Sequence, residues 1–531
     1  MQALHRLKEN EMTAAPDRRA VGPESRESRR RELGRRFRRA VGLTALGTLI
    51  PGAGLTRTRN RRLGWALVAV TVVALAALAW FVLTHGVMRS GLALAGRPEL
   101  LRFAAIAFVV GGLVWCGSIV LTAIRTRPAW LDRTRSRVLA AFTTVMVLLV
   151  GGTSYKAAEY ATITQDTIQS VFKTNTTGTT EGPQLAEGED PWANTPRVNI
   201  LLLGSDAGVG RTGTRTDSMI VASINTHTGN TVLISLPRNL QYVPIPKKSP
   251  LRQLYPSGVY GKPYCIRQQK DSSDGCLLNA IWTEADQWAA NHPGSYPGVA
   301  SPGRETIRDV ISEVVGLKLD HTVVIDLKGF VQLVDAMGGV EINVRTGAYG
   351  GRLPIGGHVV NGKVVGVNGY FEPGLQHLDG YHALWYARTR AADDDYARMG
   401  RQRCVIKAVV NQVNPAAMLA KYADIARIAK DNIYTDIPGQ NLSAYVDLIE
   451  RVQQAKITSV ALDPKHGVNT ASPDFAVIRK AIEKALNPPK PKPKPAGTAT
   501  HETVAPETST PSPTPTPTPS GTAGLTNEDE C

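Results

Sequence analysis

VNILLLGSDAGVGRTGTRTDSMIVASIN, residues 198–225, holds two apolar runs with a polar, glycine-containing segment between them. Residues 198–203 are almost continuously apolar and are closed by Gly204, which predicts a buried strand. Residues 219–224 and 231–236 predict two further strands, joined by a turn around Gly229. A β-sheet is therefore expected at the centre of this region.

Helical and strand patterns alternate through the rest of the region 197–487. We predict helices at residues 278–291, 304–315, 327–336, 376–387, 396–413, 416–429, 442–454 and 476–486. We predict strands at residues 322–325, 340–344 and 456–462, with a glycine-rich hairpin region before residue 376. This alternation is typical of a layered α/β domain, so we expect an α/β fold with a mixed central sheet flanked by helices.

Charged residues stand at the ends of the three strands around residues 198–236. Asp206 follows the first strand, Arg215 and Asp217 precede the second, and Arg238 follows the third. Ligands of open α/β sheets bind at such strand ends. Carboxylates suit Mg²⁺ and guanidinium groups grip phosphate oxygens in pairs, so the combination indicates a metal-bound pyrophosphate. Each residue alone is better explained as a turn-capping aspartate or a surface arginine.

A second charged stretch, YARTRAADDDYARMGRQ at residues 386–402, gathers arginines around an acidic run. Arg398, Arg401 and Gln402 are spaced i, i+3, i+4, so on a helix they share one face. Arg388 and Arg390 would diverge on a helix, which places them where a helix ends. A salt-bridged surface helix capped by one of the acids is the alternative interpretation. The acidic run itself, residues 393–395, fits a helix start and arginine-orienting groups better than metal ligands.

The net charge of +16 is confined to the first quarter of the chain. Residues 1–137 contain 24 Lys and Arg against 8 Asp and Glu, whereas residues 138–531 contain 37 of each class. In the first quarter the arginines are interleaved with apolar runs, which is the pattern of a membrane region and not of a nucleic-acid-binding surface. We therefore expect a protein embedded in the cell membrane and no nucleic-acid partner.

Three apolar runs, residues 63–84, 100–124 and 138–155, predict transmembrane helices, and the interrupted run 40–55 is short for a span. The run 40–55 is open to a re-entrant, interfacial or strained spanning interpretation. Arginines crowd the segments before the first and third helices, so the positive-inside rule puts the N-terminus in the cytoplasm. Three crossings then place the region after residue 155 outside the cell.

The remaining segments are interpreted from composition. Residues 1–39 are arginine-rich and predict a disordered cytoplasmic tail. Residues 156–196 predict a helical stalk followed by a linker rich in Thr, Gly and Pro. Residues 197–487 form the extracytoplasmic domain, and residues 488–531, with KPKPKP and TPTPTP, predict an extended, disordered tail.

Two glycine patterns imitate nucleotide sites. Gly208, Gly210 and Gly213 spell G-x-G-x-x-G, but a strand is predicted after them where a dinucleotide site needs a helix. Residues 357–363 fit GxxxxGK, but Val364 stands where a hydroxyl should bind Mg²⁺. Flexible turns are the better interpretation of both.

The chain has five cysteines and no cysteine–histidine cluster of the kind that binds zinc. Cys265 and Cys276 lie in a loop-like stretch on the oxidising side of the membrane, so we predict a disulfide between them. Cys404 lies in an apolar helix and fits a small buried residue better than a nucleophile.

The segments quoted above, together with HTVVIDLKGFVQLVDAMGGVEINV at residues 321–344, resemble the LytR-CpsA-Psr (LCP) family of cell-wall glycopolymer ligases. The likeness spans residues 198–413 and extends more loosely to residue 486, and the preceding multi-span region resembles actinobacterial members. The resemblance implies an Mg²⁺-dependent phosphotransferase, with Mn²⁺ as a possible substitute. Its implied partners are a glycopolymer linked to polyprenyl pyrophosphate and peptidoglycan, whose acceptor is thought to be the C6 hydroxyl of N-acetylmuramic acid.

The resemblance also implies roles for the charged residues. Asp206 and Asp217 would bind the metal, and Asp206 would accept the proton of the attacking hydroxyl. The pyrophosphate would contact Arg215, Arg238, Arg388, Arg390, Arg398, Arg401 and Gln402, of which Arg238, Arg388 and Arg390 would act in catalysis with Asp206. The polyprenyl tail would enter an apolar tunnel between sheet and helices. Asn239 departs from the Pro-Arg-Asp of the family, so a salt bridge that orients an arginine there is in doubt.

Two other functions stay open at this point. A polyprenyl-pyrophosphate phosphatase would use the same site with water as acceptor. A non-catalytic membrane-anchored scaffold would bind lipid or wall without turnover, but it would not need the two carboxylates. The glycopolymer itself, whether arabinogalactan, teichoic-type or capsular, is not indicated by the sequence.

Overall fold

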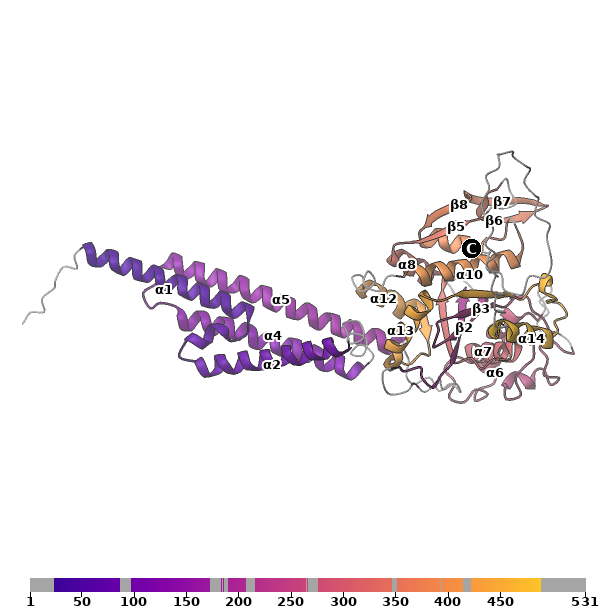
Figure 1. The fold of residues 1–531 in the computed structure, drawn as a ribbon, viewed down its shortest axis with the longest axis horizontal. Coiled ribbons are helices and arrows are strands. Elements are labelled where there is room, and N and C mark those ends of the chain that lie inside the picture. The colour runs from indigo at the N-terminus through magenta and orange to yellow at the C-terminus, as the bar shows by residue number, and fades with distance from the viewer. Residues whose placement is uncertain are drawn as a thin grey trace, which may run out of the picture. The chain divides into compact units, whose positions relative to one another are not determined.

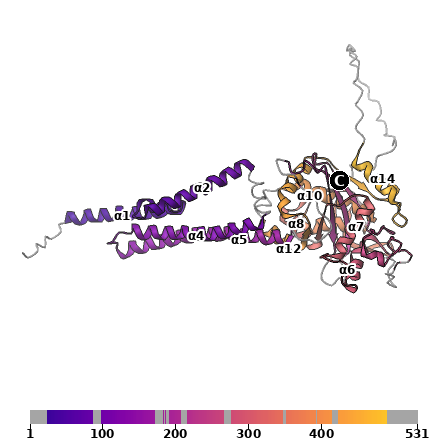
Figure 2. The same cartoon turned by 90° about the horizontal axis from the view of Figure 1, so that it is seen from below.

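The computed structural model describes residues 23–85, 97–171, 183, 185, 190–206, 215–263, 265, 276–345, 351–391, 393–413 and 422–488. The chain divides into two compact units, and the division falls within one long helix, after residue 162. Figures 1 and 2 show the helices and strands of both units.

The first unit is helical. It contains α1 (Pro23–Leu49), the 3-10 helix η1 (Ala53–Arg57), α2 (Arg61–His85), α4 (Pro98–Thr126) and the first part of α5 (Arg133–Val171). Within the described part of the chain, α2, α4 and α5 are long and apolar enough to cross a membrane. These three helices contain the three runs that the sequence predicts as transmembrane.

Helix α1 differs from the disordered tail predicted for residues 1–39. The helix begins at Pro23, and residues 1–22 lie outside the described residues. Arginine, glutamate and leucine are strong helix formers. Arg36 also contacts Glu32 one turn earlier, with 2.5 Å between Nη2 and Oε1. High charge alone therefore gave the wrong expectation for the part from Pro23 onward.

The short apolar run 40–55 forms the end of α1 and the start of η1. Pro51 and Gly52 separate the two helices, and Gly52 has φ +80°, a conformation that favours glycine. Gly54 lies so close to helix α4 that an added Cβ would stand 2.6 Å from Cγ2 of Thr122. Part of this run packs within the helical unit, where Leu43 and Leu55 are buried, whereas Leu46, Leu49 and Ile50 are exposed.

The second unit is built on a six-stranded mixed sheet with strand order β10-β3-β2-β1-β4-β9. The strands are β1 (Arg197–Ser205), β2 (Thr216–Asn225), β3 (Thr231–Ser235), β4 (His321–Asp326), β9 (Ile433–Thr435) and β10 (Ile457–Ala461). The β1–β2, β2–β3 and β4–β9 pairs are antiparallel, whereas β1–β4 and β3–β10 are parallel. The predicted mixed central sheet is confirmed.

Helices cover both faces of this sheet (Figure 1). On one face, α6 (Ile281–Asn291), α7 (Pro302–Val315) and α14 (Phe475–Leu486) pack on Leu201 and Leu203 of β1. On the other face, α10 (Asp395–Gln412) and α13 (Leu442–Gln453) pack near Ile200 and Leu202. Alternate residues of β1 face opposite layers, and both layers are apolar, which explains the almost continuous apolar run.

The remaining helices of this unit are α8 (Leu327–Met337), α9 (Gly380–Arg388) and α12 (Tyr422–Asn432). Short 3-10 helices occur at η2 (Pro250–Gln253), η3 (Leu278–Ala280), η4 (Gly439–Asn441) and η5 (Pro464–His466). The predicted helix 416–429 overlaps α12, and residues 414–421 lie outside the described residues.

Two small antiparallel sheets lie over α9 and α10. One pairs β5 (Val340–Val344) with β8 (Gly374–Leu378), and the other pairs β6 (Leu353–Val360) with β7 (Lys363–Phe371). Their apolar side chains share one core with α9 and α10. Residues 376–378 are strand, so the start of the predicted helix 376–387 is wrong. The GxxxxGK pattern is a hairpin turn with Gly362 at φ +77°, as expected.

Candidate active site

A cavity of about 250 Å³ lies where strands β1 and β4 end, beneath helices α8, α9 and α10. It brings together seven of the nine charged or polar residues that the sequence singles out. They are Asp206, Asp217, Arg238, Arg388, Arg390, Arg398 and Gln402. Segments almost two hundred residues apart therefore line one space.

The sheet register explains how the strand-end residues meet. Ser205 of β1 pairs with Thr216 of β2, so Asp206 and Asp217 lie at the same edge. Strand β3 runs antiparallel to β2 and ends at this edge with Ser235, three residues before Arg238. The carboxylate of Asp206 also accepts a hydrogen bond, at 3.0 Å, from the backbone N–H of Arg215, the residue that precedes β2.

Asp217 and Arg238, which both line the cavity, form an ion pair. The Nη1 atom of Arg238 donates to Oδ1 of Asp217 at 2.8 Å. Burial alone would raise the pKa of Asp217, but the guanidinium groups of Arg238, Arg398 and Arg390 outweigh it and hold the pKa below its ordinary value. Asp217 is therefore a carboxylate that stays ionised.

Asp395 lies among three arginines. Its carboxylate accepts two hydrogen bonds from Arg398, at 3.1 and 3.0 Å, and lies 3.6 Å from both Arg238 and Arg390. Asp394 caps helix α10 by accepting from the backbone N–H of Ala397 at 2.8 Å. The prediction that the acidic run starts a helix and orients arginines is confirmed.

Arg388 and Arg390 lie where a helix ends, as predicted. Helix α9 ends at Arg388, whose guanidinium lies 5.6 Å from the ring centroid of Trp385. Burial lowers the pKa of Arg390, and the like charges of Arg238 and Arg398 lower it further. A phosphate between these guanidinium groups would relieve their mutual repulsion.

Arg401 does not line this cavity, although the spacing i, i+3 predicted a shared face with Arg398. Its guanidinium donates to the backbone carbonyl oxygens of Tyr386 and Thr389 and forms a double hydrogen bond with Asp393. Arg401 thus fixes the loop that carries Arg388 and Arg390. These hydrogen bonds to backbone carbonyl oxygens hold the Arg401 side chain away from the cavity. The spacing of residues along a helix cannot predict such contacts.

Arg215 also falls outside the lining of the cavity. Its side chain is exposed, and its backbone takes part in the hydrogen bonds with Asp206. Gln402 does line the cavity, and its side chain accepts a hydrogen bond from the hydroxyl of Ser218 at 3.2 Å. Asn239 is exposed, and Arg238 is oriented by Asp217 and Asp395 instead. The doubt raised by the missing family aspartate is therefore answered by other carboxylates.

The residues present fit a magnesium ion that takes part of its coordination from a ligand. Asp206 and Asp217 offer hard oxygen atoms to one cavity, and the described residues contain no cluster of three or more metal-ligating side chains. Mg²⁺ commonly uses one or two carboxylates with phosphate oxygens and water, so two carboxylates suffice. Asp217 already contacts Arg238, which would share it with the metal.

The cavity also has an apolar part of its lining. Its walls come from β4, α8, α9 and α10, with Val323, Ile325, Leu327, Phe330, Leu384, Val405 and Ile406. Sequence reasoning missed these residues because they look like ordinary core positions. It also missed Asp326, which lines the cavity and caps α8 by accepting from Gly329 N–H at 2.6 Å. Asp326 directly follows the apolar run of strand β4, which is the same signal that pointed to Asp206.

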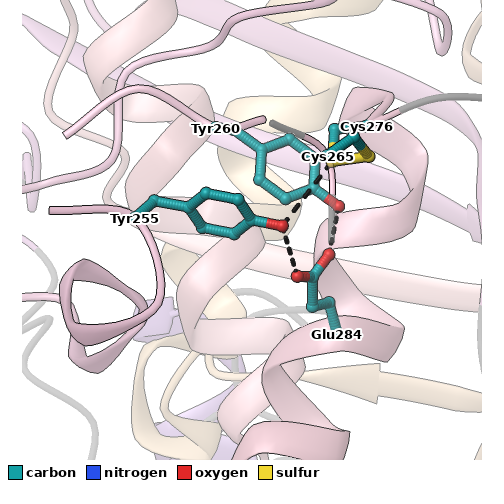
Figure 3. The surroundings of a disulfide bond; sticks show 5 residues. All are labelled: Tyr255, Tyr260, Cys265, Cys276 and Glu284. Atoms are coloured by element: carbon teal, nitrogen blue, oxygen red, sulfur yellow. Dashed lines mark hydrogen bonds between the residues drawn. A yellow bond between two sulfur atoms is a disulfide. The ribbon is translucent and has the colours of Figure 1, made fainter. Parts of the chain in front are cut away.

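The predicted disulfide between Cys265 and Cys276 is present. Beside it, the hydroxyls of Tyr255 and Tyr260 donate to the buried carboxylate of Glu284, at 2.6 and 2.5 Å (Figure 3). The residues after Cys276 then pair with the loop of Arg238, because Asn279 N–H donates to the carbonyl of Arg238 at 3.1 Å. The disulfide therefore anchors the segment that supports Arg238.

Comparison with known protein families identifies the second unit. The LytR_cpsA_psr family model matches residues 149–488, which is more than half of the chain. The chain belongs to the LytR-CpsA-Psr family. The α/β domain described above is therefore an LCP domain, as the sequence motifs indicated.

Individual relatives are more distant. A polyisoprenyl-teichoic acid–peptidoglycan teichoic acid transferase TagU from Oceanobacillus iheyensis is 29% identical over 45% of this chain and 59% of its own length. The cell wall biosynthesis protein LcpA from Corynebacterium glutamicum is 26% identical over 58% of this chain and 56% of its own. The crystal structure of B. subtilis TagV matches 55% of this chain and 98% of that one, with 21% identity and a TM-score of 0.35. The chain thus spans little more than half the length of these two curated relatives.

Proposed function

We propose that this chain transfers a glycopolymer from a polyprenyl-pyrophosphate carrier to peptidoglycan. The observation that carries the proposal is that one cavity is lined both by a charged group of residues and by an apolar group. A polyprenyl pyrophosphate has the same two parts, an anionic head and a hydrocarbon chain. The TagU relatives are named polyisoprenyl-teichoic acid–peptidoglycan teichoic acid transferases, which supports the direction of transfer.

The hydrocarbon chain of the carrier would lie between β4 and helices α8 to α10. The aliphatic and aromatic side chains there, such as Ile325, Phe330 and Ile406, remove apolar surface from water, at about 25 cal/mol per Å². The pyrophosphate would then lie against Arg238, Arg388 and Arg390, which line the same cavity. Phosphoryl transfer depends on positioning and charge neutralisation, which these side chains supply.

In the proposed reaction, the acceptor hydroxyl attacks the phosphorus atom that carries the glycopolymer. We propose the C6 hydroxyl of N-acetylmuramic acid as this acceptor. A new phosphate ester forms, the bond from that phosphorus to the bridging oxygen breaks, and polyprenyl phosphate leaves with the bonding electrons. Asp206 accepts the hydroxyl proton in this proposal, because the carboxylate of Asp217 is engaged by Arg238 at 2.8 Å.

Asp206 and Asp217 would hold Mg²⁺, or Mn²⁺ in its place, which when bound would supply positive charge to the pyrophosphate oxygens. Arg398 keeps Asp217 at this place by binding its backbone carbonyl oxygen at 2.7 Å. The arginines that line the cavity would stabilise the charge of the leaving polyprenyl phosphate.

The same proposal includes the membrane topology. We propose that α2, α4 and α5 cross the cell membrane with the N-terminus in the cytoplasm, since arginines crowd residues 57–62 and 125–137. The LCP domain would then lie outside. The disulfide between Cys265 and Cys276 supports this placement, because such bonds persist in oxidising compartments.

The test uses the full chain in proteoliposomes, with a polyprenyl-pyrophosphate-linked oligosaccharide and a soluble peptidoglycan fragment. We expect a phosphodiester-linked product that requires both the fragment and a divalent cation, and that is lost with EDTA. Arg427→Ala, which removes an exposed arginine paired with Asp424, is the matched control for variants at the cavity.

Other outcomes would replace the proposal. Equal release of polyprenyl phosphate with and without the fragment would identify a phosphatase. Binding of the lipid without any release would identify a scaffold.

A further inference from the structure

Helices α4 and α5 line a cavity of about 370 Å³ that lies wholly within the helical unit. We propose that this cavity is a binding site for one anionic phospholipid, whose phosphate binds Arg127 and whose acyl chain lies along α5. The inference needs only that the two helices cross a bilayer, and it does not depend on the reaction proposed above.

One face of each helix forms the lining. At the end of α4, Val120, Ala123 and Arg127 follow the spacing i, i+3, i+7, so they lie on one side. On α5, the lining continues with helical spacing from Ser136 to Leu148. The cavity is therefore a groove along both helices. It runs from the polar connection between α4 and α5 into the apolar part of each helix.

The length of the groove matches one leaflet of a bilayer. Ser136 and Leu148 are twelve residues apart, which is about 18 Å of helix. The hydrocarbon core of a bilayer is about 30 Å thick, so one leaflet measures about 15 Å. Trp130, in the connection before α5, is 86% exposed, and tryptophan is enriched where bilayer and water meet. An acyl chain that starts near the level of Ser136 therefore fits along the groove.

The side chains along the groove suit hydrocarbon. Ala123, Ala140 and Thr144 are small, so they leave space that larger side chains would fill. The hydroxyl of Thr143 donates to the backbone carbonyl oxygen of Leu139 at 2.7 Å, so it is satisfied within α5. The middle of the groove therefore offers an acyl chain mainly aliphatic contacts.

The charge at the polar end favours a phosphate. Among the described residues that line the cavity, Arg127 alone is charged. Residues 125–137 contain five arginines and one acid, Asp132, whose carboxylate accepts a hydrogen bond from the backbone N–H of Arg135 at 2.8 Å. A guanidinium group binds phosphate oxygens in charge-assisted hydrogen bonds, and basic pockets between membrane helices bind anionic head groups. An anionic phospholipid therefore matches both the polar and the apolar end of the groove.

A second copy of this chain is a poorer occupant. In a copy with the same orientation, α2 begins with Arg61 and Arg62, and α5 begins with Arg133, on the side of the membrane where α4 ends. Any of these helix ends against Arg127 would bring like charges together at low dielectric constant, which is unfavourable. A phosphate in the same place neutralises the charge of Arg127.

The first measurement compares lipids on the unaltered full chain in mild detergent. The chain is irradiated with a phosphatidylglycerol whose acyl chain carries a diazirine, and the labelled peptides are mapped. We expect labelling within residues 120–124 and 139–148. Unlabelled phosphatidylglycerol should compete about fivefold better than phosphatidylcholine. Equal competition by the two lipids, or equal labelling of the exposed helix α2, would mean nonspecific lipid contact and overturns the proposal.

The second measurement uses two matched pairs of variants. Arg127→Gln should lower the labelling about fivefold, whereas Arg133→Gln, at an exposed arginine outside the lining, should change it by less than about twofold. Ala140→Trp fills the groove and should remove most of the labelling, whereas Ala141→Trp, at the exposed neighbour outside the lining, should keep it. Equal labelling in the two members of either pair overturns the proposal. A dimer that blocks labelling would identify a second copy as the occupant and also overturns it.

Discussion

Arg398 joins helix α10 to strand β2 by donating a hydrogen bond from Nη1 to the backbone carbonyl oxygen of Asp217, at 2.7 Å. The other side of the same guanidinium binds both carboxylate oxygens of Asp395. The side chain is buried, at 4% exposure. Arg398 therefore uses its donors within the protein, and its first effect is to fix the positions of Asp217 and Asp395.

The first prediction concerns Arg398→Ala. The substitution leaves Asp395 with one fewer cation and the Asp217 carbonyl without this donor, so we expect the free energy of unfolding to fall by about 3 kcal/mol. Arg398→Lys should recover less than half of this loss, because an ammonium group cannot bind the carboxylate and the carbonyl in the same fork geometry. Urea unfolding of the purified LCP protein measures both. A stability equal to wild type in Arg398→Ala would contradict this anchoring role of the guanidinium.

In contrast to Arg398→Ala, Arg390→Ala should leave the stability almost unchanged and lower the activity. The side chain is half exposed and its contact with Asp395 is long, at 3.6 Å. Its loss should leave the free energy of unfolding within the range of ordinary surface variants, about 0.5 kcal/mol. The rate of polymer transfer should fall by roughly 10²- to 10³-fold, as for the loss of one group that stabilises developing charge. Transfer at the rate of the Arg427→Ala control would refute its place in the site.

Asp217→Asn should change stability in a pH-dependent way. The folded-state pKa of Asp217 is lowered, so its ionised form contributes stability above the unfolded-state pKa, near 3.9. That contribution disappears as the pH falls through the lower, folded-state pKa. The wild-type protein should therefore be more stable than the variant at pH 7 by about 1–3 kcal/mol, with the difference shrinking below about pH 4. Unfolding curves at pH 7, 5 and 3.5 test this, and a constant difference would reject it.

The main features of the fold could be predicted from local patterns. Strand β1 is an almost continuous apolar run because Leu201 and Leu202 face two different apolar layers. Because Asp206 follows the end of this strand, the sequence identified it as a candidate site residue. Strand β8 escaped prediction because residues 374–378 owe their extended shape to pairing with β5, thirty and more residues earlier, and no local period records such a partner.

The candidate site was predictable in its residue types but not in the direction of each side chain. Helical spacing grouped Arg401 with Arg398, yet Arg401 turns to carbonyl oxygens of the preceding loop. The lining of the apolar interior could not be distinguished from core, since Phe330 and Ile406 have the same pattern in either role. Both the direction of the Arg401 side chain and the lining of the cavity depend on contacts between residues that are distant in the sequence.

Asn239→Asp tests whether the departure from the family pattern matters. Asn239 is exposed, and Arg238 already contacts Asp217 at 2.8 Å and Asp395 at 3.6 Å. A third carboxylate at this place should therefore change the transfer rate by no more than about twofold, the effect of roughly 0.5 kcal/mol. Steady-state rates of the variant and the wild type decide it. A tenfold gain would mean that the network around Arg238 is incomplete in this chain.

The last prediction concerns the disulfide between Cys265 and Cys276. Replacing both cysteines by serine should lower the free energy of unfolding by about 3 kcal/mol, because the crosslink restricts the unfolded chain. The backbone of Leu278 and Asn279, which follows Cys276, donates to the carbonyls of Leu240 and Arg238. The transfer rate should therefore fall as well, even at a temperature where the variant is fully folded.

Cys116→Ser is the control for this double variant, since Cys116 is free and lies in α4 of the other unit. Cys116→Ser should change neither the free energy of unfolding nor the transfer rate. If the double variant lost stability but kept the full transfer rate at low temperature, the support of Arg238 by this segment would be excluded. The disulfide would then act on folding alone, and the position of Arg238 would not depend on this segment.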